Sequence, residues 1–261
     1  RPLRHVMTSV AGRPAHDTGP AANAALAGRR ILELADEKGV YCGKLLADMG
    51  ADVIKVEPPG GDATRQLPPF WEDKADPDGS LFFLYMNTSK RGVTLDITRP
   101  EGQALFKQLA RTADVIVETF PPGRLDTLGL GYDTLKQEHA GLVFTSITGF
   151  GQTGPYRDFA SAGIVASALG GAMYVTGEAE DPPVTLAGSQ AHVMASTYAA
   201  VSSMIALHHA TRSGEGQHVD ISVEETTASV THICGVGKWL DDHIIPKRMG
   251  TGLFASVPSG A

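Results

Sequence analysis

The stretch Leu45-Leu-Ala-Asp-Met-Gly-Ala-Asp-Val-Ile-Lys-Val-Glu-Pro-Pro-Gly-Gly-Asp62 decides the fold. It contains the end of a helix expected at residues 40–49, a turn at Gly50, a β-branched run at 52–56 and a Pro/Gly loop at which a strand must stop. An apolar run at 30–34 predicts another strand upstream. A helix separates the two strands, and they are too far apart for a hairpin, so a parallel βαβ unit is predicted.

The rest of the chain continues to alternate between strand and helix patterns. Strands are expected at residues 92–97, 114–118, 142–147 and 217–221. Helices are expected from a cap at Thr98, at 125–128, 133–138 and 162–173, from Ser189 or Gln190 onward, and at 223–240. This alternation predicts an α/β fold with a doubly wound parallel sheet, in which ligands bind at the carboxyl ends of the strands.

Apolar residues at helical spacing predict which helix faces are buried. They are Leu45, Leu46 and Met49 in the first helix, then Leu105, Phe106 and Leu109 in the helix after Thr98. The same spacing recurs in the long helix at Met194, Tyr198, Val201, Ile205 and His208.

Composition excludes several classes of protein. A chain of 261 residues can bury one sizeable core or two modest ones. A net charge of -7 without a Lys/Arg cluster argues against a nucleic-acid partner. Cys42 and Cys234 lack metal-ligand spacing and are expected to be buried, reduced thiols of a cytoplasmic protein. No apolar run approaches the roughly 20 residues needed to span a bilayer.

Two features could carry a nucleotide site. Gly39 and Gly43 lie at the first expected strand-to-helix turn, but they fall short of the Gly-x-Gly-x-x-Gly pattern of dinucleotide sites. Glu57, at the end of the second strand, could bind a ribose hydroxyl or be a solvated loop residue. A cationic segment, Lys90-Arg91, could bind phosphate groups together with Arg65 and Arg124 on neighbouring loops, or could be solvated surface. No zinc spacing, Walker loop or Ser-His-Asp elbow is present, so no metal site is predicted.

Four strings carry a resemblance to a known family. They are Gly-Ala-Asp-Val-Ile-Lys-Val-Glu-Pro-Pro-Gly-Gly-Asp (50–62), Asn-Thr-Ser-Lys-Arg-Gly-Val-Thr-Leu-Asp (87–96), Asp-Val-Ile-Val-Glu-Thr-Phe-Pro-Pro-Gly (114–123) and Ser-Ile-Thr-Gly-Phe-Gly-Gln-Thr-Gly-Pro (146–155). In this order they resemble the class III coenzyme A transferases, which include formyl-CoA transferase, the carnitine and bile-acid CoA transferases and the α-methylacyl-CoA racemases. The resemblance runs from about Gly28 to the end of the chain.

The resemblance implies a Rossmann-like large domain, a smaller domain later in the chain, and two subunits threaded through each other as interlocked rings. Three segments are therefore expected here. Residues 1–27 form a disordered leader, 28–240 form the CoA-binding large domain, and 241–261 form a glycine- and proline-rich connection toward a small domain that is missing from this chain.

The resemblance also implies that an acyl-CoA is the substrate, with no metal. The implied CoA-binding residues are Asp36, Glu37, Lys90, Arg91, Thr119, Phe120, Thr127 and Leu128. At two of these positions the chain departs from the family, because Thr119 replaces the usual Asn and Thr127 replaces a frequent Arg.

The position of the family's nucleophile holds a different residue. In the transferases an aspartate at the start of a helix attacks the acyl-CoA thioester to form a mixed anhydride, and the position here is His192. The racemase relatives would have a His-Asp pair where this chain has Ala162 and Gly163, whereas Glu225 matches a family glutamate. A ring at a helix N-terminus is expected to be neutral, so His192 is either catalytic or structural.

Four hypotheses follow. In the first, this chain is the non-acylated subunit of a hetero-oligomeric CoA transferase, and a paralogous partner supplies the aspartate. In the second, the chain is a self-sufficient enzyme, as an interlocked homodimer, that uses His192 or another group such as Asp158. The third is a non-catalytic acyl-CoA-binding module, and the fourth is a nicotinamide dehydrogenase.

Overall fold

The computed structural model describes residues 23–231, 239–240, 243, 245, 248 and 250. Most of the predicted leader at 1–27 and most of the predicted connection at 241–261 lie outside the described residues, as does Cys234. None of the described helices is long and apolar enough to cross a membrane.

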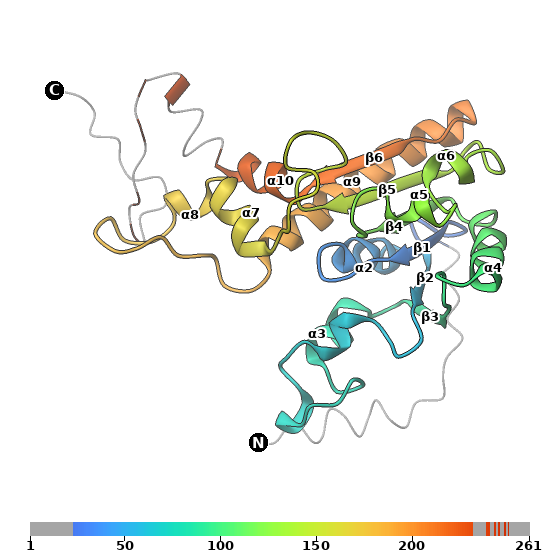
Figure 1. The fold of residues 1–261 in the computed structure, drawn as a ribbon, viewed down its shortest axis with the longest axis horizontal. Coiled ribbons are helices and arrows are strands. Elements are labelled where there is room, and N and C mark those ends of the chain that lie inside the picture. The colour runs from blue at the N-terminus through green and yellow to red at the C-terminus, as the bar shows by residue number, and fades with distance from the viewer. Residues whose placement is uncertain are drawn as a thin grey trace.

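Within residues 23–231, six strands form one parallel sheet (Figure 1). The strands are β1 (Arg30–Leu34), β2 (Asp52–Glu57), β3 (Arg91–Thr94), β4 (Val115–Glu118), β5 (Val143–Thr148) and β6 (His218–Ser222). Their order is β3-β2-β1-β4-β5-β6, so the chain first builds outward from β1 on one side and then on the other. The doubly wound prediction is confirmed. The direction of winding changes between β1 and β4, which is where such sheets bind ligands.

The predicted βαβ unit is confirmed with nearly the predicted bounds. Helix α2 (Val40–Asp48) connects β1 to β2, and the pair is parallel with Arg30 opposite Asp52. Leu46 of α2 is fully buried, as predicted, but Met49 lies past the helix end and is exposed. A residue at the C-cap no longer follows the helical periodicity, and for this reason the spacing rule was wrong there.

The two faces of the sheet carry separate apolar cores. On one face, α2 and the long helix α9 (Gln190–Ser213) cover Ile31, Val53 and Val143. On the other face, α4 (Pro100–Ala110) places Phe106 in a core that also receives side chains from α5 (Arg124–Thr127) and α6 (Tyr132–Leu135). The predicted inward position of Leu105 is wrong, because that side chain is exposed.

Helix α9 buries mostly small residues, and Leu207 and His192 are the larger side chains that are buried with them. Its buried positions include Ala195, Ala199, Ala206 and Ala210, whereas the larger Tyr198, Val201 and Ile205 are exposed. Small side chains allow close approach of α9 to α2 and to β5 and β6, which it contacts. The large apolar residues at helical spacing therefore mark the outer face of this helix.

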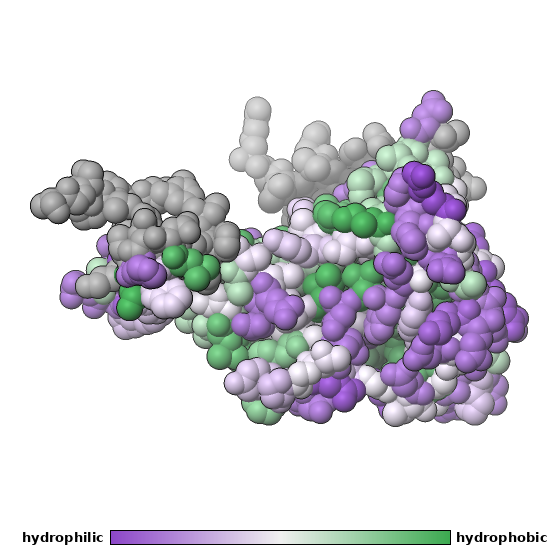
Figure 2. All heavy atoms as spheres, turned by 90° about the horizontal axis from the view of Figure 1, so that it is seen from above, coloured by the Kyte–Doolittle hydropathy of each residue, from purple (hydrophilic) through white to green (hydrophobic). Residues whose placement is uncertain are grey.

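In the view of Figure 2, hydrophilic residues gather over one end of the molecule and hydrophobic patches lie nearer its middle.

Three other predicted helices differ from the structure. Thr98 does not cap α4; Arg99 is the N-cap, and the Thr98 hydroxyl donates to Asp96 instead. The helix predicted at 162–173 is divided into α7 (Gly163–Leu169) and α8 (Ala172–Val175), because Gly171 has a φ of +82°. The helix predicted at 223–240 is α10 (Val223–Val230), which ends with its C-cap at Thr231.

The remaining elements lie between β2 and β3. They are η1 (Ala63–Gln66), η2 (Trp71–Asp73) and α3 (Leu81–Met86).

Candidate substrate-binding cleft

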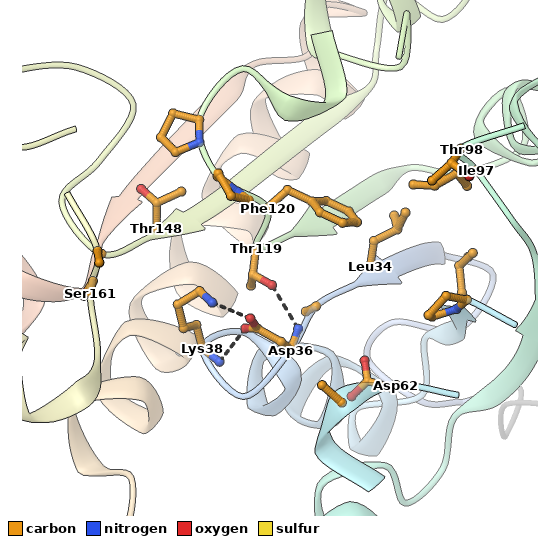
Figure 3. Close-up of a pocket in the computed structure, with 18 of the residues that line it drawn as sticks. Leu34, Asp36, Lys38, Asp62, Ile97, Thr98, Thr119, Phe120, Thr148 and Ser161 are labelled. Carbon is orange, nitrogen blue, oxygen red and sulfur yellow. Dashed lines mark hydrogen bonds and ion pairs between the residues drawn. The ribbon is translucent and has the colours of Figure 1, made fainter. Parts of the chain in front are cut away.

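A cleft of about 810 Å³ lies at the carboxyl ends of the first five strands. Figure 3 shows its labelled residues arranged around this space. Its lining residues are Leu34, Ala35, Asp36, Lys38, Val56, Pro58, Asp62, Ala63, Leu95–Thr98, Thr119–Pro122, Thr148, Gly149 and Arg157–Ser161. A cleft of this volume, lined by both apolar and polar residues, suits a small-molecule ligand.

The floor of the cleft lies at the switch point between β1 and β4. The backbone N–H of Asp36 donates to Thr119 Oγ1 at 2.9 Å, so the hydroxyl connects the two strand ends (Figure 3). Asp36 also pairs with Lys38, which lines the same wall. Three residues that the family resemblance implies, Asp36, Thr119 and Phe120, are therefore together in the cleft. Thr119 has a structural hydrogen bond that an asparagine amide would have to replace.

A network of four charged side chains lies beneath this floor. Glu33 is fully buried on β1, and both of its oxygens accept hydrogen bonds from Lys90, at 2.9 and 2.8 Å. Lys55 lies 3.3 Å from Glu33 and 3.2 Å from Asp62, which lines the cleft. Burial lowers the pKa of Lys90 despite the attraction of Glu33, whereas Glu33 and Asp62 outweigh burial and raise the pKa of Lys55.

Lys90 is thus enclosed by protein. Its side chain is only 2% exposed, and its ammonium also donates to Val40 O at 2.8 Å and to Asn87 Oδ1 at 3.0 Å. It does not line the cleft, although the family resemblance implied that it contacts CoA.

The other cations named from the sequence are also outside the cleft. Arg65 donates to both oxygens of Glu57, at 2.6 and 2.9 Å. Glu57, the candidate to bind a ribose hydroxyl, is therefore already paired. Arg91 pairs with Asp52 at the amino end of β3. Arg124, Thr127 and Leu128 belong to or follow α5, beyond the lining residues Thr119–Pro122.

His192 lies in a second, smaller pocket of about 250 Å³, between α7, α8 and the start of α9. The ring is 5% exposed, and Nδ1 lies 3.7 Å from Glu37 Oε1. Burial lowers the pKa of His192, against the opposing charge of Glu37, and this direction favours the uncharged ring. Glu37 lines this pocket while Asp36 and Lys38 line the cleft, so one short loop borders both spaces.

Two further candidates are not next to His192. Glu225 is exposed in the first turn of α10, where its N–H donates to Ser222 Oγ at 3.2 Å, and it lines neither pocket. Asp158 lines the large cleft. Gly163, by contrast, lies close to the ring, because a β-carbon built there would be 3.5 Å from His192 Nε2.

Sequence reasoning missed two cations of the cleft, Lys38 and Arg157. The only signal for each was its neighbourhood, because Lys38 follows Asp36-Glu37 and Arg157 follows the string that ends at Pro155. No group of three or more potential metal ligands occurs among the described residues.

Glu118, at the end of β4, lies directly under the cleft and is almost completely buried. Burial raises the pKa of Glu118 to about 7, against the opposing hydrogen bonds from Ser146 and from the N–H of Phe120, whose distance is 2.7 Å. Lys38 lowers and Asp126 raises this pKa further. The carboxyl group therefore takes up a proton near neutral pH and holds the backbone of a cleft residue.

We expect this burial to make stability depend on pH. The folded protein holds the Glu118 proton up to pH of about 7, whereas the unfolded chain loses it near 4.5, so stability from this group is present at low pH and lost as pH rises through 7. Relative to Glu118→Gln, the free energy of unfolding of the natural chain should fall by about 2 kcal/mol from pH 5 to pH 8. Urea unfolding of both proteins at each pH measures this difference, and a constant difference would contradict it.

Comparison with known proteins gives consistent matches. The model of "CoA-transferase family III" matches residues 26–261. A succinyl-CoA–D-citramalate CoA-transferase of Chloroflexus aurantiacus is 43% identical over 198 residues, which are 75% of this chain and 48% of that protein. The subunit BbsE of the succinyl-CoA:(R)-benzylsuccinate CoA-transferase of Thauera aromatica is 42% identical over 199 residues, 76% of this chain and 48% of that subunit.

A solved structure agrees with these matches. The crystal structure of a CAIB/BAIF family protein from Brucella suis has a TM-score of 0.82 and 36% identity, and the match covers 87% of this chain and 60% of that one. The chain spans about half the length of the curated relatives described above.

Proposed function

The chain belongs to CoA-transferase family III, and from this membership we propose that its cleft binds the CoA part of an acyl-CoA during transfer of CoA to a carboxylic acid. Relatives named for succinyl-CoA make succinyl-CoA the first donor to test.

One observation carries this proposal: the four strings that resemble the family, which are far apart in the sequence, all contribute residues to the same cleft. Their contributions are Val56, Pro58 and Asp62 from the first, Leu95 and Asp96 from the second, Thr119–Pro122 from the third, and Thr148 and Gly149 from the fourth. The cleft also lies at the switch point of the sheet, where α/β folds bind nucleotide ligands. A nicotinamide dehydrogenase is less well supported, since the dinucleotide glycine pattern is absent from the sequence.

We further propose that this chain is the subunit that is not acylated, in an interlocked assembly with a paralogous partner that supplies the aspartate. A carboxylate that attacks the thioester carbonyl forms an anhydride and releases CoA thiolate, and the anhydride then allows carboxylates to exchange. An acyl-imidazole at His192 would not preserve that exchange. The buried ring beside Glu37 supports a role in shaping the second pocket. The relative BbsE is itself named as a subunit of a transferase.

A self-sufficient enzyme is the second candidate, because Asp158 lines the cleft and its carboxylate is largely exposed. An acyl-CoA-binding module without chemistry is the third. The same experiment separates these candidates from the first.

We expect the purified chain alone to bind CoA but to show no transfer from succinyl-CoA to carboxylic acids. Hydroxylamine added with succinyl-CoA should trap no modified residue in the natural chain, whereas His192→Asp should gain a hydroxamate at position 192, mapped by mass spectrometry. His192→Asn is the matched control, because its amide is not a nucleophile and should remain unmodified.

Each alternative has its own outcome in this experiment. Robust turnover by the natural chain, with a hydroxamate at Asp158 or an acyl group at His192, would contradict the non-acylated role and support the second candidate. Absence of activity after addition of the paralogous subunit, with CoA still bound, would support the binding module. Failure to bind CoA at all would contradict the proposed function.

A further inference from the structure

One wall of the cleft carries polar atoms that no other described residue satisfies. Across the described part of the chain, four buried side-chain atoms have no hydrogen-bond partner: Thr148 Oγ1, Gln152 Nε2, Arg157 Nε and His192 Nδ1. The first three belong to the end of β5 and the loop that follows it. Two of them, Thr148 and Arg157, line the large cleft. Buried polar groups are rarely left unpaired, so these atoms need partners that the described residues do not supply.

The guanidinium of Arg157 lies between the ends of two strands. A β-carbon on Gly123, in the turn after β4, would lie 3.1 Å from Arg157 Nη2, although Arg157 itself follows β5. Among the described residues its nearest carboxylate is that of Asp158, which is largely exposed. The distance of 3.8 Å is too long for a hydrogen bond. The donors of Arg157 are thus weakly engaged.

The other cations near the cleft already have close carboxylate partners. Lys38 pairs with Asp36, Lys55 with Asp62 and Lys90 with Glu33. Of the described residues that line the cleft, four are acidic and two are cationic. The acidic lining residues are Asp36, Asp62, Asp96 and Asp158. An anionic ligand in this cleft would therefore be attracted chiefly by Arg157.

We propose that Arg157, together with the hydroxyl of Thr148, binds a phosphate group of the ligand in this cleft. The inference rests on the proposed function, in which the ligand is CoA, and adds the residues that recognise its phosphates. Phosphate oxygens accept two parallel hydrogen bonds from a guanidinium, and a buried hydroxyl can donate a third. Thr148 is 3% exposed, and its hydroxyl has no partner among the described residues, so its hydrogen-bonding capacity is unused.

The test measures ligand affinity with Arg157→Gln, which keeps hydrogen-bonding capacity and removes the charge. Its matched control is Arg111→Gln, because Arg111 is an exposed arginine paired with Glu138 outside the cleft. Isothermal titration is done with CoA, with dephospho-CoA, which lacks the 3′-phosphate, and with pantetheine, which has no phosphate. Thermal melts of each variant establish that the protein is folded.

We expect Arg157→Gln to weaken CoA binding about tenfold to a hundredfold, as for loss of a charge-assisted hydrogen bond, and to leave pantetheine binding unchanged. Arg111→Gln should bind CoA like the natural chain. If Arg157→Gln also weakens the binding of dephospho-CoA, Arg157 contacts the diphosphate. If the affinity for dephospho-CoA is unchanged, Arg157 contacts the 3′-phosphate. Thr148→Val should weaken CoA binding in the same direction by a smaller factor.

The two proposals fail in different ways. If the natural chain binds CoA and Arg157→Gln binds it equally well, Arg157 is not a phosphate ligand and the proposed function is unaffected. Equal weakening of CoA and pantetheine would show that the substitution only disturbs the cleft, and would overturn the assignment. If the natural chain does not bind CoA, the proposed function and this inference are both overturned.

Discussion

Replacement of Lys90 by methionine is expected to destabilise the protein by about 3–5 kcal/mol. The methionine has a similar length but carries no charge, so the fully buried carboxylate of Glu33 would lose the cation that donates to both of its oxygens. Lys55 donates to Glu33 Oε1 at 3.3 Å, so Oε2 of Glu33 would be left without a cation. The hydrogen bonds to Val40 O and Asn87 Oδ1 would be lost as well.

Its neighbour provides the control. Arg91 is the next residue, at the start of β3, but its side chain is 64% exposed, and Asp52 retains Arg30 as a second partner. Arg91→Met should therefore change the free energy of unfolding by at most about 1 kcal/mol. Urea denaturation followed by circular dichroism measures both variants.

The same pair also tests the role implied by the family resemblance. If Lys90→Met folds with unchanged stability and binds CoA more weakly, Lys90 is a CoA ligand, and the buried network described above does not stabilise the fold.

The second large effect is expected for Gly43→Ala. A β-carbon at this position would lie 1.7 Å from Glu33 Oε2 and 2.8 Å from Glu33 Cδ. The glutamate cannot move away without breaking its bonds to Lys90, so the substitution should destabilise the protein by about 3 kcal/mol. Helix propensity alone gives the opposite sign, since alanine is favoured over glycine in a helix by about 1 kcal/mol.

Gly92→Ala is the matched control for this prediction. Gly92 is exposed on β3, and a β-carbon there would meet only Glu57 Oε1, at an ordinary 3.7 Å. The control should therefore be neutral within about 0.5 kcal/mol. An increase in melting temperature for Gly43→Ala would contradict the prediction, because it would show that propensity outweighs the clash with the buried carboxylate.

Both predictions concern a network that holds the cleft from below. Lys55 joins Glu33 to Asp62 and also donates to Ala35 O at 2.8 Å, and Ala35 and Asp62 both line the cleft. Residues of the first two family-like strings, Lys55 and Lys90, thus stabilise the loops that form the cleft rather than face the ligand. Residues in a family-like string can therefore be required for folding as well as for binding.

Local patterns predicted the framework well. The strand at 30–34 and the helix that begins at residue 40 occur where the apolar runs and the turn at Gly50 placed them. Strand and helix signals are local, because they depend on side-chain periodicity and on turn residues. The same rules were wrong for Met49, Leu105 and Thr98. At the end of a helix, or beside a competing carboxylate such as Asp96, tertiary contacts decide the orientation of a side chain.

The sequence by itself determined the parallel α/β sheet, the family, and the set of loops at the strand ends. Only the tertiary structure decided which cations of those loops are paired with carboxylates. Lys90 and Glu33 are 57 positions apart, and Arg157 lies beside the turn at Gly123 although it follows a different strand. Pairing between charges depends on distance in space and on burial, neither of which a linear pattern records. For this reason the sequence pointed to Lys90 and Arg91, whereas the fold leaves Arg157 facing the cleft with its donors weakly engaged.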